Sequence, residues 1–328
     1  MTKIRIGISG YGNIGKGVEQ AVARNEDMEL VALVTRRDPG TISPATPGVR
    51  VVEESKLSSL VGFVDVMLLC GGSATDLPEQ TPRYAALFHT LDSFDTHANI
   101  PEHFDRVDAA ARQGGHLSLI SCGWDPGLFS ILRAYGVAAL PQGQSDTFWG
   151  RGVSQGHSDA IRRIPGVKNG IQYTVPIQSA VEAVRSGSGP VLTPRQKHQR
   201  QCFVVAEQGA DTAAITAAIQ TMPNYFADYD TTVTFITEQE LRDQHSAMPH
   251  GGFVFRTGQT GSTGMCQRME FSLSLDSNPE FTGSVMVAYA RAVARLAQAG
   301  RTGCLTVLDI APALLCPQSA EQLRRTLL

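Results

Sequence analysis

The sequence predicts an α/β protein with a doubly wound parallel sheet, followed by a second region of α+β type. Over the first 121 residues, apolar runs of strand length alternate with stretches of helical periodicity. A glycine-rich turn joins the first of these strands to the first helix. After residue 122, short β-like runs are mixed with helical pieces. Because alternating strands and helices connect through right-handed crossovers, the first region is expected to form a parallel sheet.

The composition is that of a globular protein large enough for two domains. The chain has 328 residues, of which 42% are hydrophobic. Its 28 basic and 31 acidic residues give a formal net charge of −3, which provides no positive field of the kind that binds nucleic acid or an anionic membrane. A small molecule is therefore the expected partner.

Neither a membrane segment nor a metal site is expected. No apolar run reaches membrane-spanning length, and the strand-like residues 4–8 follow Met1 too closely to leave room for a secretory signal. The six cysteines form no CxxC pair and lack the paired His/Cys spacing of zinc sites. We expect a cytoplasmic protein with reduced thiols and no bound metal.

Periodicity places the elements of the first region in a regular order. Strands are expected at 3–9, 29–34, 64–70, 90–92 and 117–121, and helices at 16–24, 78–88 and 101–113. The apolar run at 64–70 is typical of a buried central strand. A stretch rich in Pro, Gly, Ser and Thr at 38–48 predicts a loop.

The remainder of the chain predicts less regular structure. Its expected elements are β-like runs at 201–205 and 231–236, a helix at 284–299, and an apolar stretch at 305–315 that Pro312 interrupts. We expect a first domain over 1–121, a second region over 122–280, and a segment over 281–328 that packs back on the first domain.

The glycine turn predicts a bound dinucleotide. It reads Gly10-Tyr11-Gly12-Asn13-Ile14-Gly15, between a predicted strand and a predicted helix. In a Rossmann domain the first glycine permits a tight bend, the second lets the pyrophosphate approach the backbone, and the third lets the helix pack on the strand. Such a motif also occurs as an ordinary glycine turn, but the strand–turn–helix context favours dinucleotide binding. The first domain is therefore expected to be a Rossmann domain.

The end of the second predicted strand favours NADP over NAD. NAD enzymes usually place an acidic residue there, against the ribose 2′-hydroxyl. This chain has Thr35-Arg36-Arg37 instead, and two guanidiniums with a hydroxyl would bind a 2′-phosphate. The alternative is that the arginine pair is a solvent-exposed charge in a loop.

Further cofactor residues are expected where later strands end. Cys70, Gly71, Gly72, Ser73, Ala74, Thr75 and Asp76 follow the central strand. Small residues at the carboxyl end of a strand fit the crevice where α/β sheets bind ligands, although a plain small-residue turn would read the same way. Of these, residues 70–75 are expected to contact the cofactor, together with Asp92, Ser93, Cys122, Gly123 and Trp124.

Several segments beyond the glycine turn resemble the meso-diaminopimelate dehydrogenase family. They lie at 70–76, 122–127, 154–159, 162–166, 200–204, 248–252 and 275–279, so the resemblance spans nearly the whole chain. It implies an NADP-dependent homodimer that reversibly deaminates the D-centre of meso-2,6-diaminopimelate, in lysine and cell-wall biosynthesis. The products would be L-2-amino-6-oxopimelate and ammonia. The second region would then bind substrate and mediate dimerisation.

The resemblance also implies the substrate residues. Arg200, Thr174, His250 and Asn278 would hold the distal L-amino acid end, and Arg200 is chemically suited to clamp its carboxylate. The D-centre would be surrounded by Asp95, Asp125, Gln155 and Gly156, with Trp149 as a wall of the pocket. Either Asp125 or Asp95 would act as the acid–base group.

Structural roles are alternatives for each of these residues. Arg200 could belong to a solvated basic face formed by residues 197–200, Asp125 before Pro126 suits a turn or a helix cap, and Asp95 could cap the segment after it. His157 lies in a Gly-His-Ser-Asp run without a nucleophile elbow, so a structural hydrogen bond is expected for it rather than a triad.

The sequence is also compatible with other functions. One is a related NADP-dependent oxidoreductase, such as a homoserine or dihydrodipicolinate-type dehydrogenase, or a relative that accepts a broader range of D-amino acids. Another is a non-catalytic protein that senses NADP.

Overall fold

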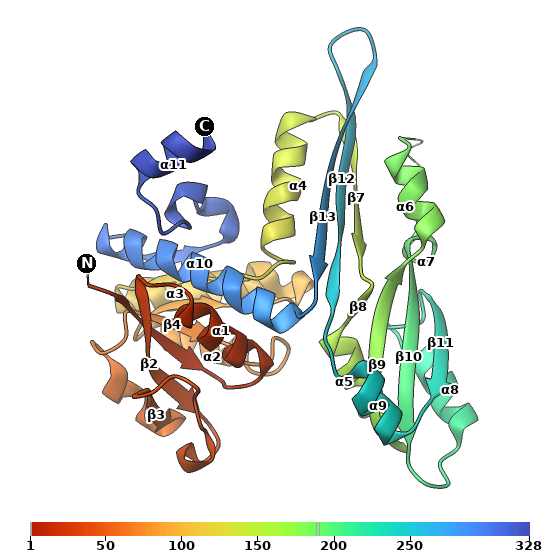
Figure 1. Ribbon diagram of the computed structural model, residues 1–328, viewed down its shortest axis with the longest axis horizontal. Helices are drawn as coiled ribbons and strands as arrows, with labels where there is room; N and C mark the ends of the chain where they lie inside the picture. The colour runs from red at the N-terminus through yellow and green to blue at the C-terminus, as the bar shows by residue number, and fades with distance from the viewer. Residues whose placement is uncertain (1, 188, 190) are drawn as a thin grey trace. The chain divides into compact units, whose positions relative to one another are not determined.

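The computed structural model describes residues 2–187, 189 and 191–328. Contacts within the chain divide it into two compact units, one formed by Met1–Ile131 with Pro279–Leu328 and the other by Leu132–Asn278. Figure 1 shows the elements of each unit. Among the described residues, no helix combines the length and the apolar character needed to cross a membrane.

A seven-stranded parallel sheet forms the centre of the first unit, in the order β14-β6-β5-β4-β1-β2-β3. Its strands are β1 (Ile4–Ser9), β2 (Met28–Thr35), β3 (Arg50–Glu53), β4 (Val66–Leu69), β5 (His89–Asp92), β6 (Leu117–Leu119) and β14 (Gly303–Leu305). The helices are α1 (Asn13–Ala23), α2 (Leu77–Ala85), α3 (Ile100–Gly114), α10 (Asn278–Gln298) and α11 (Ala320–Leu327), and α4 (Leu128–Ala139) spans the boundary between the units. The predicted α/β class with a doubly wound parallel sheet is confirmed.

The central strand β4 is buried on both faces of the sheet. Val66 and Leu68 belong to the hydrophobic core that includes residues of α1 and α10, whereas Met67 and Leu69 belong to the core on the other face. Because side chains alternate along a strand, both faces require apolar residues. This double burial explains the continuous apolar run in the sequence.

The C-terminal segment is part of the first unit. Helix α10 packs closely on α1, since a Cβ on Gly17 would lie 2.5 Å from the Pro279 carbonyl oxygen and one on Gly283 would lie 2.5 Å from Gly17. Strand β14 then pairs with β6 at the edge of the sheet. The first unit extends to Ile131, ten residues beyond the end expected for the first domain.

The structure contains elements that the periodicity did not predict. Strands β3 and β14 have four and three residues, too few to display a clear alternation of apolar and polar side chains. Helix α1 begins at Asn13 rather than residue 16, so its first turn lies within the glycine motif, directly after Gly12. The expected strand at 201–205 is the central part of a longer strand, His198–Ala206.

The second unit contains two sheets. One has the order β11-β10-β9-β8 and the other, antiparallel, the order β13-β12-β7. The strands are β7 (Gly143–Trp149), β8 (Gly152–Val153), β9 (Val167–Pro176), β10 (His198–Ala206), β11 (Asp230–Phe235), β12 (His250–Thr260) and β13 (Met265–Leu275). The helices are α5 (Gln155–Arg162), α6 (Gln178–Arg185), α7 (Pro194–Lys197), α8 (Thr212–Gln220) and α9 (Glu238–His245). In Figure 1 the β12–β13 hairpin projects beyond the other strands of this unit.

Each sheet of the second unit has its own core. Side chains of β10 such as Cys202 and Val204 pack with Ile161 of α5 and Ile215 of α8. Phe148 and Phe255 of the antiparallel sheet pack instead with α6. The inward-facing positions of β10 therefore lie on the face that α5 and α8 cover.

Candidate functional site

The glycine turn of the first unit leaves open space beside the start of α1. Gly10 has a φ of +91°, which favours glycine, and a Cβ on Gly15 would lie 2.2 Å from the Gly10 carbonyl oxygen. Around Gly12, by contrast, no heavy atom of the described residues lies within 4 Å of where a Cβ would be. The backbone at Gly12 is therefore accessible to a pyrophosphate at the helix N-terminus, and the turn fits a dinucleotide.

The two arginines after β2 are anchored to neighbouring loops. Arg36 donates Nη1 and Nη2 to the carboxylate of Asp76, at 2.8 and 3.1 Å, and that carboxylate raises the pKa of Arg36. Arg37 donates Nη2 to the Tyr11 carbonyl at 3.1 Å, and the buried hydroxyl of Thr35 accepts the Arg37 N–H at 3.0 Å. Both arginines are exposed and lie directly after β2 at the carboxyl edge of the sheet, where they are bonded to the loops that follow β1 and β4.

The Tyr11 side chain anchors the glycine turn to α1. Its hydroxyl donates to the buried carboxylate of Glu19, which also accepts the Thr46 N–H at 2.7 Å. Burial and the Glu19 carboxylate together raise the pKa of Tyr11 to about 12. The phenol therefore remains protonated at neutral pH.

The loop after β4 is held to the loop after β5. Asp76 accepts the Gly72 N–H at 2.9 Å, and a Cβ on Gly72 would lie 2.7 Å from Thr75 Oγ1. Ser73 Oγ accepts the backbone N–H of Asp95 at 2.8 Å. The small residues at 70–75 therefore form a tight turn, and Ser73 within it holds the backbone of Asp95, one of the candidate catalytic residues.

The two candidate catalytic carboxylates have different environments. Asp95 is exposed, and its side chain makes no hydrogen bond within the part of the chain that the structure describes, so it does not act as a cap. Asp125 is half-buried in a tight turn in which a Cβ on Gly127 would lie 1.8 Å from the Gly123 carbonyl oxygen. Beside it, buried Trp124 packs edge-on against Phe129, with ring centroids 5.3 Å apart.

Asp92 lies in a different environment from the one expected of a cofactor residue. Its side chain is completely buried, and its carboxylate has four hydrogen-bond partners. Ser93 is half-buried, whereas Cys122 is buried, and burial raises the pKa of the Cys122 thiol. At the carboxyl ends of β5 and β6, Asp92 and Cys122 are therefore buried and Ser93 is half-buried.

In the second unit, strand register places several expected substrate residues side by side. Arg200 of β10 pairs with Thr174 of β9, and Thr174 pairs with Gly152 of β8. The ring of His250 lies over Gly152, since a Cβ there would be 2.3 Å from His250 Cγ. Arg200, Thr174 and His250 therefore form a continuous row across the strands.

Arg200 is buried and does not belong to a solvated basic face. The residue is 7% exposed, donates Nη1 to Thr174 Oγ1, and lies over the ring of Tyr229 with Cζ 3.9 Å from the centroid. Burial lowers the pKa of Arg200, and its Nε is buried without a partner among the described residues. A buried guanidinium with an unused N–H is suited to bind a carboxylate.

His198 holds Trp149 in place. The backbone N–H of Trp149 donates to His198 Nε2 at 2.9 Å, and the two rings stack with centroids 5.4 Å apart. Burial, followed by the charges of Arg200 and Lys197, lowers the pKa of His198 to about 3. The imidazole is therefore neutral at physiological pH and accepts this hydrogen bond throughout.

Met248 contacts both Gln155, the first residue of α5, and Asn278, the last residue of the second unit. Gln155 Nε2 lies 3.0 Å from Met248 Sδ, and the Asn278 N–H donates to the Met248 carbonyl at 2.8 Å. No heavy atom lies within 4 Å of where a Cβ on Gly156 would be, among the residues described. The backbone of residues 155–156 is thus accessible at a helix start, where N–H groups lack intrahelical partners.

His157 has the structural role expected for it. Its Nδ1 shares a hydrogen bond with Ser154 Oγ at 2.7 Å, and burial, then the charge of Arg200, lowers its pKa to about 4. Ser158 Oγ donates to the Ser154 carbonyl, and Asp159 pairs with arginines of its own helix turn. These three side chains do not form a catalytic triad.

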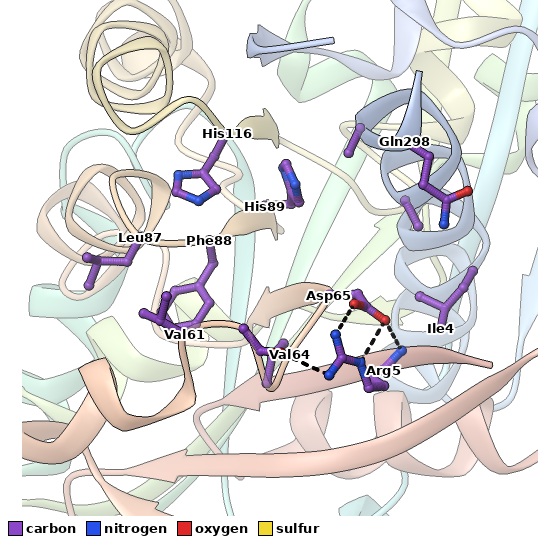
Figure 2. Close-up of a pocket in the computed structure, with 13 residues that line it drawn as sticks. Ile4, Arg5, Val61, Val64, Asp65, Leu87, Phe88, His89, His116 and Gln298 are labelled. Carbon is purple, nitrogen blue, oxygen red and sulfur yellow. Dashed lines mark hydrogen bonds and ion pairs between the residues drawn. The ribbon is translucent and has the colours of Figure 1, made fainter. Parts of the chain in front are cut away.

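A cavity of about 330 Å³ lies at the opposite edge of the parallel sheet. Figure 2 shows the Arg5–Asp65 ion pair on one side of it and His89 with His116 on the other. These residues lie at or just before the amino ends of strands β1, β4, β5 and β6. The cavity is therefore distinct from the edge that carries the glycine turn, and none of the expected site residues lines it.

Sequence reasoning missed His198, Tyr229, Asp76 and His103. For His198 a signal was present, since it precedes Arg200 by two positions and shares its strand face by alternation. Asp76 lay in the segment after β4 but carried no sign that it would reach Arg36. Tyr229 and His103 approach their partners only through tertiary packing.

The chain is similar to several known proteins over its whole length. The family model of the diaminopimelic acid dehydrogenase C-terminal domain matches residues 123–277. A meso-diaminopimelate D-dehydrogenase from Ureibacillus thermosphaericus is 60% identical over 328 residues, which cover 100% of both chains. The DAP dehydrogenase of Corynebacterium glutamicum, solved in complex with DAP, is 46% identical with a TM-score of 0.94, over 99% of both chains.

An engineered D-amino acid dehydrogenase bound to NADP+ is also similar, with 44% identity, a TM-score of 0.90 and 99% of both chains covered. The resemblance expected from the sequence is confirmed over the full length of the chain. The chain belongs to the meso-diaminopimelate D-dehydrogenase family.

Proposed function

We propose that this chain catalyses the NADP-dependent, reversible oxidative deamination of the D-centre of meso-2,6-diaminopimelate. Substrate, NADP+ and water would give L-2-amino-6-oxopimelate, ammonium, NADPH and a proton. The observation that carries the proposal is the row formed by buried Arg200, buried Thr174 and half-buried His250, in a chain whose relatives bear this activity in their names.

The distal amino acid end would be held in the second unit. The Arg200 guanidinium would bind the L-carboxylate, because its Nε is buried without a partner and Thr174 fixes one of its other nitrogens. His250 and Asn278 would supply further polar contacts. Trp149, fixed by His198, would form a wall of the pocket.

Carboxylates would contact the ammonium group of the D-centre. Asp95 is exposed and its side chain has no hydrogen bond to another described residue, so it is available to an ammonium group. Asp125 would also contact the ammonium, and one of the two would take the amine proton before hydride leaves. The accessible backbone N–H groups of Gln155 and Gly156 would bind the D-carboxylate.

NADP would bind at the carboxyl edge of the parallel sheet. The pyrophosphate would lie over Gly12, and Arg36 and Arg37 would contact the 2′-phosphate. When bound, NADP+ supplies the hydride acceptor for the reaction. Asp76 would keep Arg36 oriented while N–H groups of that guanidinium not bonded to Asp76 face the phosphate.

Six free cysteines support a reducing, cytoplasmic location. Disulfides form and persist in oxidising compartments and are rare in the cytoplasm. Loss of hydration moreover raises the pKa of the thiols of Cys70, Cys122, Cys202 and Cys304. They would remain protonated and unreactive.

We also propose a homodimer formed through an apolar face of the second unit. On α4, Tyr135 and Val137 are 54% and 50% exposed. This helix packs on Arg256 of β12. Met269 and Phe271 of β13 pair with Arg256 and Val254 of β12, so their side chains lie on the same face of the sheet as Arg256. Tyr135 and Val137 are exposed, and Met269 and Phe271 are half-buried. Neighbouring apolar side chains exposed on a surface are typical of an interface, and the same face on two copies could form a twofold contact.

The substrate assignment predicts a selective assay. Purified protein with NADP+ should form NADPH, measured at 340 nm, with meso-diaminopimelate and not with the L,L-isomer, which lacks a D-centre. D-Alanine and homoserine should give rates lower by about 100-fold or more, because neither offers a distal carboxylate to Arg200. Equal rates with D-alanine would indicate a broad D-amino acid dehydrogenase, and NADPH binding without turnover on any of these amino acids would indicate a sensor.

The glycine turn predicts opposite outcomes for two similar substitutions. Gly12→Ala should fold normally, because its φ of −92° suits any residue and no atom lies near the new methyl group. The methyl would obstruct the pyrophosphate, and the NADP+ Kd should rise about 30-fold, or about 2 kcal/mol. Gly15→Ala should instead lower the free energy of unfolding by about 3 kcal/mol, since its Cβ would contact the Gly10 carbonyl.

Isothermal titration calorimetry and urea unfolding measure both quantities for the two variants. Unchanged NADP+ affinity in Gly12→Ala would show that the pyrophosphate does not approach this turn.

The proposed dimer predicts a mass change on substitution. Light scattering should give twice the 35.2 kDa chain mass for the unmodified protein. Tyr135→Glu should shift the mass toward the monomer, because it buries a charge in the apolar contact. Val191→Glu is the control, since Val191 is 91% exposed and lies outside this face. A dimer that survives Tyr135→Glu would place the interface elsewhere.

A further inference from the structure

The buried carboxylate of Asp92 joins the two loops that carry the candidate catalytic residues. Asp92 is the last residue of β5 and is 0% exposed. Its Oδ1 accepts the N–H of Phe94 at 3.1 Å and the N–H of Ser121 at 2.8 Å. Phe94 directly precedes Asp95, and Ser121 begins the loop that leads to Asp125. One oxygen atom therefore fixes the starting points of both loops relative to each other.

The second carboxylate oxygen is held from behind by two helices. Thr81 of α2 donates its hydroxyl to Oδ2 at 2.8 Å, and His103 Nε2 of α3 lies 2.7 Å from the same atom. The Asp92 carbonyl also accepts the Cys122 N–H at 2.9 Å. Side chains of α2 and α3 thus fix the position of the Asp92 carboxylate. Through its hydrogen bonds, the carboxylate in turn fixes the backbone of both loops.

Packing holds the His103 ring in position beside this carboxylate. The ring is 3% exposed and stacks on Phe94 with centroids 4.1 Å apart, and its Nδ1 is buried without a partner in the described chain. When Nε2–H donates to Asp92 Oδ2, the ring nitrogen left without a partner is Nδ1. A ring nitrogen that carries no hydrogen leaves only a lone pair unpaired, which is less costly than a buried, unpaired N–H.

The loop after β6 depends on the bond to Asp92. Ser121 has a φ of +57°, which is unfavourable for a residue other than glycine. Its Oγ is buried without a partner among the described residues, so the side chain does not compensate for that backbone conformation. Its N–H bond to Asp92 is therefore a main constraint that holds the start of this loop.

We infer that Asp92, supported by His103, is a positioning residue for the reaction proposed above, on which this inference rests. It would hold Asp95 and Asp125 in their reactive arrangement without contacting the reacting atoms. Loss of the carboxylate should therefore slow hydride transfer more than it weakens binding, because misplacement of a reactive group by about 1 Å can cost about 100-fold in rate.

Three variants separate positioning from general stability. Asp92→Asn keeps the size of the side chain but presents an NH2 group to donors on one side. His103→Phe keeps the ring that stacks on Phe94 and removes one donor to Oδ2. Thr90→Val is the matched control, since Thr90 and Ser118 are both 0% exposed and their 2.8 Å hydrogen bond joins the same strands, β5 and β6, away from the loops.

Asp92→Asn and Thr90→Val should both lower the melting temperature. Asp92→Asn should also lower kcat by about 30-fold with KM values within about threefold, whereas Thr90→Val should keep kcat within about twofold. The kinetic isotope effect with diaminopimelate deuterated at the D-centre should rise in Asp92→Asn, because hydride transfer becomes slower than product release. His103→Phe should show the same pattern with a smaller loss, and it carries the test if Asp92→Asn does not fold.

Hydrogen exchange provides a readout that does not need turnover. Backbone amides of residues 93–97 and 121–127 should exchange at least about tenfold faster in Asp92→Asn than in Thr90→Val. If the wild-type protein does not oxidise meso-diaminopimelate, the proposed function fails, while this exchange comparison still tests the positioning. Equal exchange in the two variants, or equal kcat losses with an unchanged isotope effect, would overturn the inference.

Discussion

Parallel pairing of the strands is the constraint on which the site in the first unit depends. Because β1, β2, β4, β5 and β6 run in one direction, the loops that follow them leave the sheet at the same edge. Hydrogen bonds then join these loops in pairs: Arg37 to Tyr11, Arg36 to Asp76, Ser73 to Asp95, and Asp92 to Ser121. The residues expected to bind the cofactor and the candidate catalytic residues are thus parts of one connected edge.

In the second unit, antiparallel strand register and burial bring the expected substrate residues together. Arg200 has lost most of its hydration, and within the described chain Thr174 and the ring of Tyr229 replace only part of it. A buried guanidinium with an unused N–H is costly to keep in a folded protein, and a bound carboxylate would offset that cost.

The sequence predicted features that depend on short stretches of chain. The glycine turn, the arginine pair and the buried central strand are each contained within a few residues, and the structure has them in those positions. Environments that depend on distant packing were not predictable. Arg200 appeared compatible with a solvated face because the strand was expected to begin at residue 201, whereas β10 begins at His198 and turns both side chains inward. The complete burial of Asp92 depends on Thr81 and His103, neither of which is close to it in sequence.

In the proposed reaction, the D-centre of meso-diaminopimelate loses its hydride while its L-centre is held. Transfer of deuterium to the cofactor distinguishes the two centres, with meso-diaminopimelate labelled at one centre or the other and mass spectrometry of the NADPH formed. Label from the D-centre should appear in NADPH, and label from the L-centre should remain in the L-2-amino-6-oxopimelate product. Transfer from the L-centre, or from both centres, would exclude this assignment of the reacting centre.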